Sequence, residues 1–317
     1  MKTRAEFDIL LAKAQKDDPE AQYKVADLYF DGNGIDVNYQ LGLYWGEKAA
    51  KNGQKLAQLQ IGHWLVEEAS SELPNILPED SQLYEYCSIY SLDQLLSYDD
   101  KESVPLSLKE EVYDMSFEKI KHYPSVQEAI KKLEVGLNWI EKSSLQGVSQ
   151  AQLLLGKLCL RRPPFPYDVH KAVTFLEMAS SQHDTQAMFL LAMIHYKGFN
   201  GLMIDQKKAL GLLYLAASFG HPNAFTNLAV LILQGKLNED KETAIEYLRT
   251  AASTGNPEAM LNLAINLYLG NGVERNREEA IDLCKQVTFF GFKMVEKLLD
   301  KMLSGADDLS LEEKYIQ

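Results

Sequence analysis

Two short stretches of the chain have the composition of a phosphate-binding loop. Gly32-Asn33-Gly34 and Gly270-Asn271-Gly272 each follow an apolar run, and a glycine-rich loop that opens a helix can hold phosphate with its backbone N–H groups. Neither stretch follows a predicted β-strand, and neither is followed by the lysine that a phosphate loop requires. Glycine and asparagine also tolerate the positive φ of a tight turn. We therefore interpret both stretches as turns.

The histidines and cysteines lack the spacing of metal sites and of nucleophilic catalysis. Cys87, Cys159 and Cys284 lie far apart in the sequence, and we predict that they are reduced structural thiols. No pair of the six histidines has zinc-site spacing, and no Gly-x-Ser-x-Gly sequence is present. His195 is expected in the core or at a helix junction rather than acting as a base. We predict no catalytic residue, no metal ligand and no cofactor, and thus no enzyme.

Charge and hydrophobicity restrict the classes of partner. Hydrophobic residues make up 46% of the 317 residues and the net charge is -13, which favours a folded chain and argues against binding nucleic acid or an anionic membrane. The N-terminal residues MKTRAEFDILLAKAQKDD lack the apolar core of a signal peptide, and no apolar run is long enough to cross a bilayer. We predict a cytoplasmic protein, unless it is exported without an N-terminal signal. The acidity fits either an ordinary soluble protein or a basic protein partner.

Small residues recur with a period of about 36 residues. Ala151, Ala187, Ala224, Ala259 and Val295 are spaced by 36, 37, 35 and 36 residues, and Ala21 and Ala57 by 36. Each repeat is predicted to contain two helices, because apolar residues recur at helical spacing between glycines that suit helix ends and prolines that suit helix starts.

The repeat resembles a known family. Residues 21–53 follow the pattern A-x3-L-G-x2-Y-x2-G-x-G-V and K-A-x2-W-x2-K-A-A-x2-G at Ala21, Tyr29, Gly32, Gly34, Trp45, Lys48, Ala49, Ala50 and Gly53. Residues 259–291 match the same pattern in part. The pattern is similar to that of Sel1-like repeats, relatives of tetratricopeptide repeats. The resemblance implies an all-α fold, a right-handed superhelical α-solenoid of about six helix pairs. It also implies an adaptor or scaffold whose repeats carry no catalytic residues.

We expect one repeat array over residues 1–303. A leading helix is predicted over residues 3–16 and a closing helix over 295–303, followed by an acidic tail over 304–317. The distance from Ala57 to Ala151 is too long for one repeat. We therefore predict an insertion over residues 66–124 within the second repeat, between a first helix that starts near Ala57 and a second helix over 125–147.

The predicted insertion is acidic and rich in tyrosine. It contains fourteen Asp and Glu against four Lys, together with six of the sixteen tyrosines. We expect two or three helices there, packed on the array. One interpretation is a solvated extension with its own small core. The other is a docking surface for a basic partner, because tyrosines provide contact area and carboxylates steer a basic protein. The candidate binding residues in the insertion are Tyr84, Glu85, Asp93, Tyr98 and Glu110.

Further candidates lie on the first helix of each repeat, which lines the inner face of related helical repeats. By that analogy the residues are expected at offsets near two, six, nine and ten from each small residue of the period. Some of them could instead lie at helix junctions, and Phe189, Met193 and Tyr196 form the best apolar group. These candidates are Tyr23, Asp27, Phe30, Lys157, Phe189, Met193, Tyr196 and Lys197.

The sequence therefore predicts a non-catalytic, monomeric, cytoplasmic bacterial scaffold or adaptor for protein–protein interaction. A more specific hypothesis is an immunity or regulatory protein that binds a basic protein. Two alternatives stay open, namely an effector exported to a host cell and a hydrolase or transferase with a site in the insertion.

Overall fold

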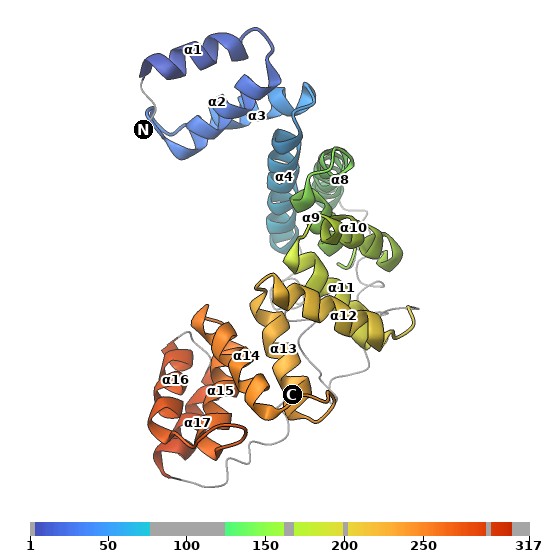
Figure 1. Cartoon of the computed structure of the whole chain (residues 1–317). Helices are drawn as coiled ribbons and strands as arrows, with labels where there is room; N and C mark the ends of the chain where they lie inside the picture. Colours follow the sequence, from blue (N-terminus) through green and yellow to red (C-terminus); the bar gives the residue numbers. More distant parts are fainter. Residues whose placement is uncertain (1–3, 77–123, 162–167, 199–201, 290–292, 306–317) are drawn as a thin grey trace. The chain divides into compact units, whose positions relative to one another are not determined.

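The computed structural model describes residues 4–76, 124–161, 168–198, 202–289 and 293–305. Every regular element in these ranges is an α-helix, and consecutive helices pack in pairs (Figure 1). The all-α prediction is confirmed. The described residues form two compact units, one that ends at Gln182 and one that starts at His183. The prediction of one array over 1–303 stays a prediction.

The first unit contains three helix pairs, α2/α3, α4/α8 and α9/α10, and the helix α1 packs against α2. The predicted leading helix is thus confirmed. The helices are α1 (Arg4–Ala14), α2 (Pro19–Asp31), α3 (Tyr39–Lys51), α4 (Lys55–Ile76), α8 (Pro124–Leu145), α9 (Ser149–Leu158) and α10 (Val169–Ser181).

The second unit contains the pairs α11/α12, α13/α14 and α15/α16, followed by α17. The helix α17 packs against α16 and buries Val295, Leu298 and Met302, so the predicted closing helix is confirmed. The acidic tail lies outside the described residues after Gly305. The helices are α11 (Thr185–Lys197), α12 (Gln206–Ser218), α13 (Pro222–Leu233), α14 (Lys241–Ser253), α15 (Pro257–Leu269), α16 (Arg277–Phe289) and α17 (Lys293–Leu303).

Local chemistry sets the helix ends. Asp18 accepts hydrogen bonds from the backbone N–H groups of the first turn of α2, and a proline occupies the first helical position. At the other end Gly32 has a φ of 68°, and Gly270 ends α15 with a φ of 72°. The two glycine-asparagine stretches therefore end helices instead of opening them, as the turn interpretation predicts.

The helices of the split repeat pack closely although residues 77–123 separate them in the sequence. A Cβ atom on Gly62 of α4 would lie 2.7 Å from the carbonyl oxygen of Gly136 of α8, and a Cβ on Gly136 would lie 2.8 Å from the carbonyl oxygen of Gly62. Glycine at both positions thus allows the two backbones to touch.

The helix α4 continues past Val66, where the insertion was predicted to begin, as far as Ile76. Two carboxylates in this extension, Glu68 and Glu72, lie 3.2 and 2.7 Å from Lys132 Nζ of α8. The start of the predicted insertion is therefore part of the α4/α8 helix pair, because its carboxylates form ion pairs with Lys132 of α8.

Buried glutamines link each helix pair of the first unit to the helix before it. Gln58 Nε2 donates to the carbonyl oxygen of Ala50 at 3.1 Å, and Gln58 Oε1 accepts from Gln146 Nε2 at 2.8 Å. Each amide satisfies a carbonyl at the end of a preceding helix and receives a side chain from the end of the following helix. The same pattern occurs at Gln22, with Ala14 and Asn52, and at Gln152, with Ser144 and Gln182.

Candidate interaction surface

A carboxylate on α2 is held by side chains from two neighbouring first helices. Gln60 Nε2 of α4 donates to Asp27 Oδ1 at 3.3 Å, and the Tyr23 hydroxyl, one turn before Asp27, also hydrogen-bonds to the carboxylate. Asp27 is half-buried. These contacts fix the carboxylate, so little side-chain freedom would be lost on binding a partner.

Aromatic and acidic side chains continue this surface by one helical turn on each helix. Trp64, one turn after Gln60, has 40% of its surface exposed. Asp31, one turn after Asp27, is exposed. We define the acidic-aromatic face as Tyr23, Asp27, Asp31, Gln60 and Trp64. It combines flat apolar contact area with two carboxylates, a composition suited to a basic protein surface.

The electrostatics of Tyr23 agree with this geometry. Partial burial raises the pKa of Tyr23 above its ordinary value, and the neighbouring Asp27 carboxylate raises it further. Tyr23 therefore stays a neutral hydrogen-bond donor at physiological pH. The two predicted binding residues Tyr23 and Asp27 are brought together with Gln60, which was not predicted.

The other candidates of the first unit lie elsewhere. Phe30 packs over α3, where a Cβ on Gly42 would lie 2.7 Å from its ring, and its ring centre is 6.4 Å from that of Tyr39. Phe30 thus fills the α2/α3 interface. Lys157 is half-buried on α9.

The candidates of α11 contribute mainly to a core cluster of the second unit. Phe189 and Met193 are buried, and Tyr196 packs partly buried against the same cluster. The Phe189 ring stacks on His221 with ring centres 4.8 Å apart. Lys197 is exposed at the end of α11. These contacts give Phe189 and Met193 a structural role.

Five candidates of the predicted insertion lie outside the described residues. They are Tyr84, Glu85, Asp93, Tyr98 and Glu110, and their binding role stays a prediction.

Comparison with known proteins identifies the repeats. The family model described as "Sel1 repeat" matches residues 19–54, 149–184, 185–221, 224–256 and 257–286, more than half of the chain. The chain belongs to the Sel1 repeat family. None of the curated proteins compared matches this Sel1 repeat protein.

Two solved structures share the fold of this Sel1 repeat protein. A Sel1 repeat protein from Oxalobacter formigenes has a TM-score of 0.58 and 19% identity, covering 86% of this chain and 85% of the other. The protein c5321, described as a protective antigen of uropathogenic Escherichia coli with an SLR fold, has a TM-score of 0.54 and 20% identity. The match covers 95% of this chain, which spans 60% of the length of c5321. At these identities the similarity concerns the fold.

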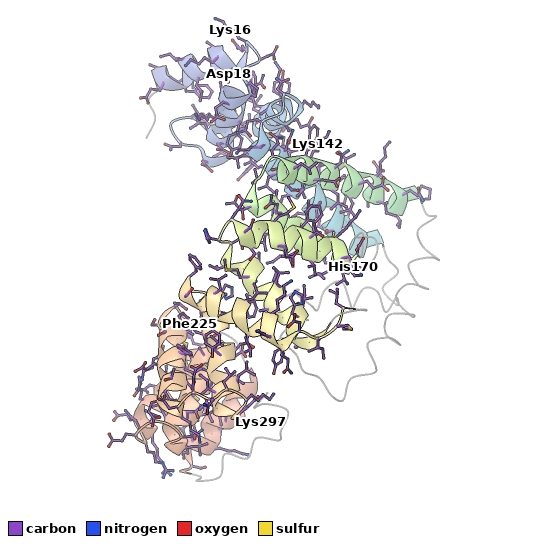
Figure 2. All side chains as sticks on the ribbon, turned by 45° about the vertical axis from the view of Figure 1, so that its right-hand side comes forward. Lys16, Asp18, Lys142, His170, Phe225 and Lys297 are labelled. Carbon is purple, nitrogen blue, oxygen red and sulfur yellow. The ribbon has the colours of Figure 1, made fainter. Side chains whose placement is uncertain are left out.

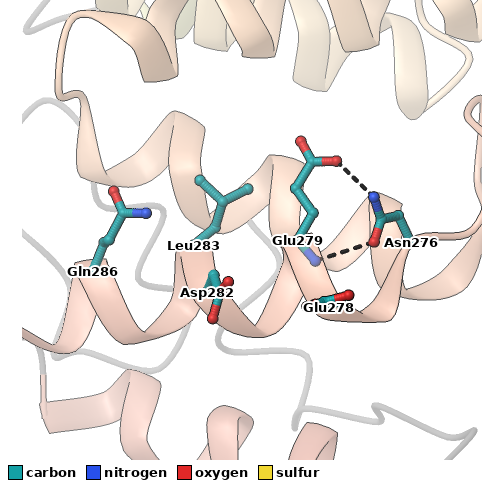
Figure 3. Close-up of a pocket in the computed structure, with 6 residues that line it drawn as sticks. All are labelled: Asn276, Glu278, Glu279, Asp282, Leu283 and Gln286. Carbon is teal, nitrogen blue, oxygen red and sulfur yellow. Dashed lines mark hydrogen bonds between the residues drawn. The ribbon is translucent and has the colours of Figure 1, made fainter.

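A shallow depression on α16 is explained by the start of that helix (Figure 3). Asn276 Oδ1 accepts from the Glu279 backbone N–H at 3.1 Å, while Asn276 Nδ2 donates to Glu279 Oε2 at 3.0 Å. Glu279 also pairs with Arg249 at 2.6 Å. Asn276 thus caps the start of α16, and Glu279 pairs with both Asn276 and Arg249, so these polar groups have structural partners. The depression is lined by Asn276, Glu278, Glu279, Asp282, Leu283 and Gln286.

The described residues of the Sel1 repeat protein contain neither a candidate metal site nor a helix that could span a membrane. No group of three or more His, Cys, Asp or Glu side chains in these ranges could hold a metal ion. None of the described helices combines the length and apolar character needed to span a bilayer.

Gln60 and Trp64 of the acidic-aromatic face were not predicted from the sequence. Both lie on α4, three and seven residues after Ala57, whereas the analogy with related repeats used offsets near two, six, nine and ten. The helical spacing of Gln60, Trp64 and the exposed Glu67 was the available signal.

Proposed function

We propose that this Sel1 repeat protein is a non-catalytic adaptor that binds a basic protein through the acidic-aromatic face. Sel1 repeat proteins are generally scaffolds for protein–protein interaction, and this supports the class of function. The observation that carries the proposal is the Asp27 carboxylate, which Tyr23 and Gln60 hold on a surface where Trp64, one turn after Gln60 on α4, is exposed.

The chemistry of the face favours a basic partner over a neutral one. Exposed carboxylates accelerate the encounter with a positively charged protein, and aromatic side chains supply contact area after docking. We further propose that the protein acts as a cytoplasmic monomer in an immunity or regulatory role, in which occupying the basic surface of its partner would block that surface.

The test begins with affinity capture by the full chain from a lysate of the source organism, with identification by mass spectrometry. Association rates of the captured protein are then measured at several salt concentrations. The test variant is Asp31→Lys with Glu67→Lys, two exposed positions. Asp31 lies one turn after Asp27 on α2, and Glu67 lies one turn after Trp64 on α4. Lysine at the last residue of α2 also suits the helix dipole, so we expect no loss of stability.

The matched control is Glu134→Lys with Glu141→Lys on α8, which makes the same change in net charge at exposed positions. We expect the test variant to slow association about tenfold or more at low salt and to flatten the salt dependence, and the control to do much less. A second variant replaces residues 77–123 with a short linker. Capture by this variant would support the acidic-aromatic face, and its failure would move the site to the insertion. Equal effects of the test and control pairs would refute the proposed face.

A further inference from the structure

Two of the three tryptophans carry a cation of this chain over the indole ring. Lys48 Nζ lies 5.5 Å from the ring centre of Trp45 on α3, and Lys142 Nζ lies 4.4 Å from that of Trp139 on α8 (Figure 2). In both pairs the lysine comes three residues after the tryptophan on the same helix. A side chain at this spacing therefore reaches the ring, whose negative face attracts a cation.

The third tryptophan, Trp64, has a carboxylate at the same spacing. The residue three positions after it on α4 is Glu67, which is exposed, as is Trp64 itself. In the described ranges, neither a cationic side chain nor a second aromatic ring packs on the Trp64 indole. Trp64 thus lacks the cation that the other two tryptophans have, and Glu67 provides a negative charge that can hold one from outside the protein.

The charged group nearest in sequence leaves Glu67 accessible. Glu67 Oε1 lies 3.6 Å from His63 Nε2, and both side chains are more than half exposed. This ion pair exists only while His63 is protonated, so a cation from a partner meets no competition from the histidine at pH 8.

The neighbouring first helices bring no cation onto Trp64. On α2, Asp31 is exposed, while the exposed Lys24 pairs with Glu20 at 3.0 Å. On α9 the cations are Lys157 and Arg161, which are both half-buried. The surroundings of the exposed indole therefore favour a positively charged ligand.

We propose that Trp64 and Glu67 bind an arginine side chain of the basic partner, with the guanidinium stacked on the indole and hydrogen-bonded to the carboxylate. This inference rests on the proposed function and names the residue by which the partner is anchored. Arginine suits the pair better than lysine, because its planar guanidinium covers the ring and presents a fork of donors to a carboxylate. The lysines over Trp45 and Trp139 belong to the same helix as the ring, so the chain itself holds them there.

The test compares two unstructured peptides of equal charge, one of alternating arginine and glycine and its twin of alternating lysine and glycine. Fluorescence anisotropy of each labelled peptide is measured at pH 8 and low salt, with the full chain as titrant. We expect the arginine peptide to bind about fivefold or more tightly than the lysine peptide. Trp64→Leu should abolish this preference, and Trp64→Phe should keep part of it, because phenylalanine also offers a π face.

Glu67→Gln should weaken binding of the arginine peptide several-fold, because the carboxylate that receives the guanidinium is lost. The matched control for the aromatic variants is Tyr39→Leu, which removes another exposed aromatic ring of the same unit. The control for the charge is Glu134→Gln at an exposed position of α8. We expect both controls to keep the preference for arginine, and circular dichroism checks that every variant is folded.

The outcomes separate this inference from the proposed function. Equal binding of the two peptides by the unchanged chain would overturn the arginine site and leave the acidic-aromatic face in place. A preference for arginine that persists in Trp64→Leu, or that is lost equally in Tyr39→Leu, would also overturn it. No binding of either peptide would overturn the proposed face together with the arginine site.

Discussion

The contact between Gly62 and Gly136 predicts that replacing a helical glycine with alanine destabilises the protein, whereas this substitution usually stabilises a helix. We consider the substitution Gly62→Ala on α4. The new Cβ would lie 2.7 Å from the carbonyl oxygen of Gly136 and 2.7 Å from Ile140 Cγ1. Ile140 is completely buried, so neither neighbour can move aside easily. The helices must separate or tilt to admit one methyl group.

The magnitude follows from two opposing terms. Alanine in place of glycine inside a helix stabilises by about 0.5–1 kcal/mol. Inserting a methyl group into a closely packed interface destabilises by about 1–3 kcal/mol. The net expectation is a loss of about 1–2 kcal/mol. Gly211→Ala on α12 is the matched control, because nothing lies within 4 Å of its added Cβ, and it should gain about 0.5–1 kcal/mol.

The assay is urea unfolding followed by two probes. All three tryptophans of the chain, Trp45, Trp64 and Trp139, lie in the first unit, so tryptophan fluorescence reports the unit that contains Gly62. Far-UV circular dichroism reports the helices of both units and serves for Gly211→Ala. If Gly62→Ala raised the fluorescence midpoint instead of lowering it, the argument from backbone contact would be wrong.

Three further outcomes follow from buried groups. Gln152→Leu should lower the stability of the first unit by about 1–3 kcal/mol, because a helix-end carbonyl loses its donor; in urea unfolding the exposed Gln182→Leu should cost less, and equal costs would contradict the role of the buried amide. Tyr268→Phe should cost about 0.5–1.5 kcal/mol by circular dichroism, since its hydroxyl bonds to α17, and no change would show that this bond adds nothing. Burial raises the pKa of Cys159 to about 11 and of Cys284 to about 12. Unfolded thiols lose their protons near pH 8.5, so stability should fall as pH rises above about 8.5, and by less in Cys284→Ala; an unchanged pH profile in that variant would refute this assignment.

Local signals account for the part of the fold that the sequence predicts. Asp18 and the following proline define the start of α2, and Gly32 defines its end, because cap chemistry depends on residues within one turn. The period of about 36 residues then places the remaining pairs. The extent of α4 was not predictable in this way. Glu68 and Glu72 have the composition of an acidic insertion, and only Lys132 of α8, distant in sequence, shows that they belong to a packed helix.

The candidate surface was predicted in part for the same reason. Tyr23 and Asp27 lie at helical spacing, so their shared face follows from periodicity. Their contact with Gln60 depends on how α2 packs against α4. The spacing of residues along one helix gives no information about that packing. Phe30 lies at the helical spacing expected for the acidic-aromatic face. Its ring instead packs against α3 at Gly42, where a larger residue would clash with it. A glycine opposite an aromatic ring is a pairwise feature, and the periodicity of each helix taken alone does not predict it.

The contacts between α4 and α8 should hold the two helices together even if the chain between them were cut. Gln146 donates a hydrogen bond to Gln58, and Lys132 forms an ion pair with Glu72. The backbones at Gly62 and Gly136 are in close contact. None of these contacts involves residues 77–123. The entropy of closing a loop changes only with the logarithm of its length. The repeat can therefore tolerate loops of different lengths between these helices, and two fragments cut there should recognise each other and reassemble. The split repeat thus offers a natural place to divide the protein into two complementing halves.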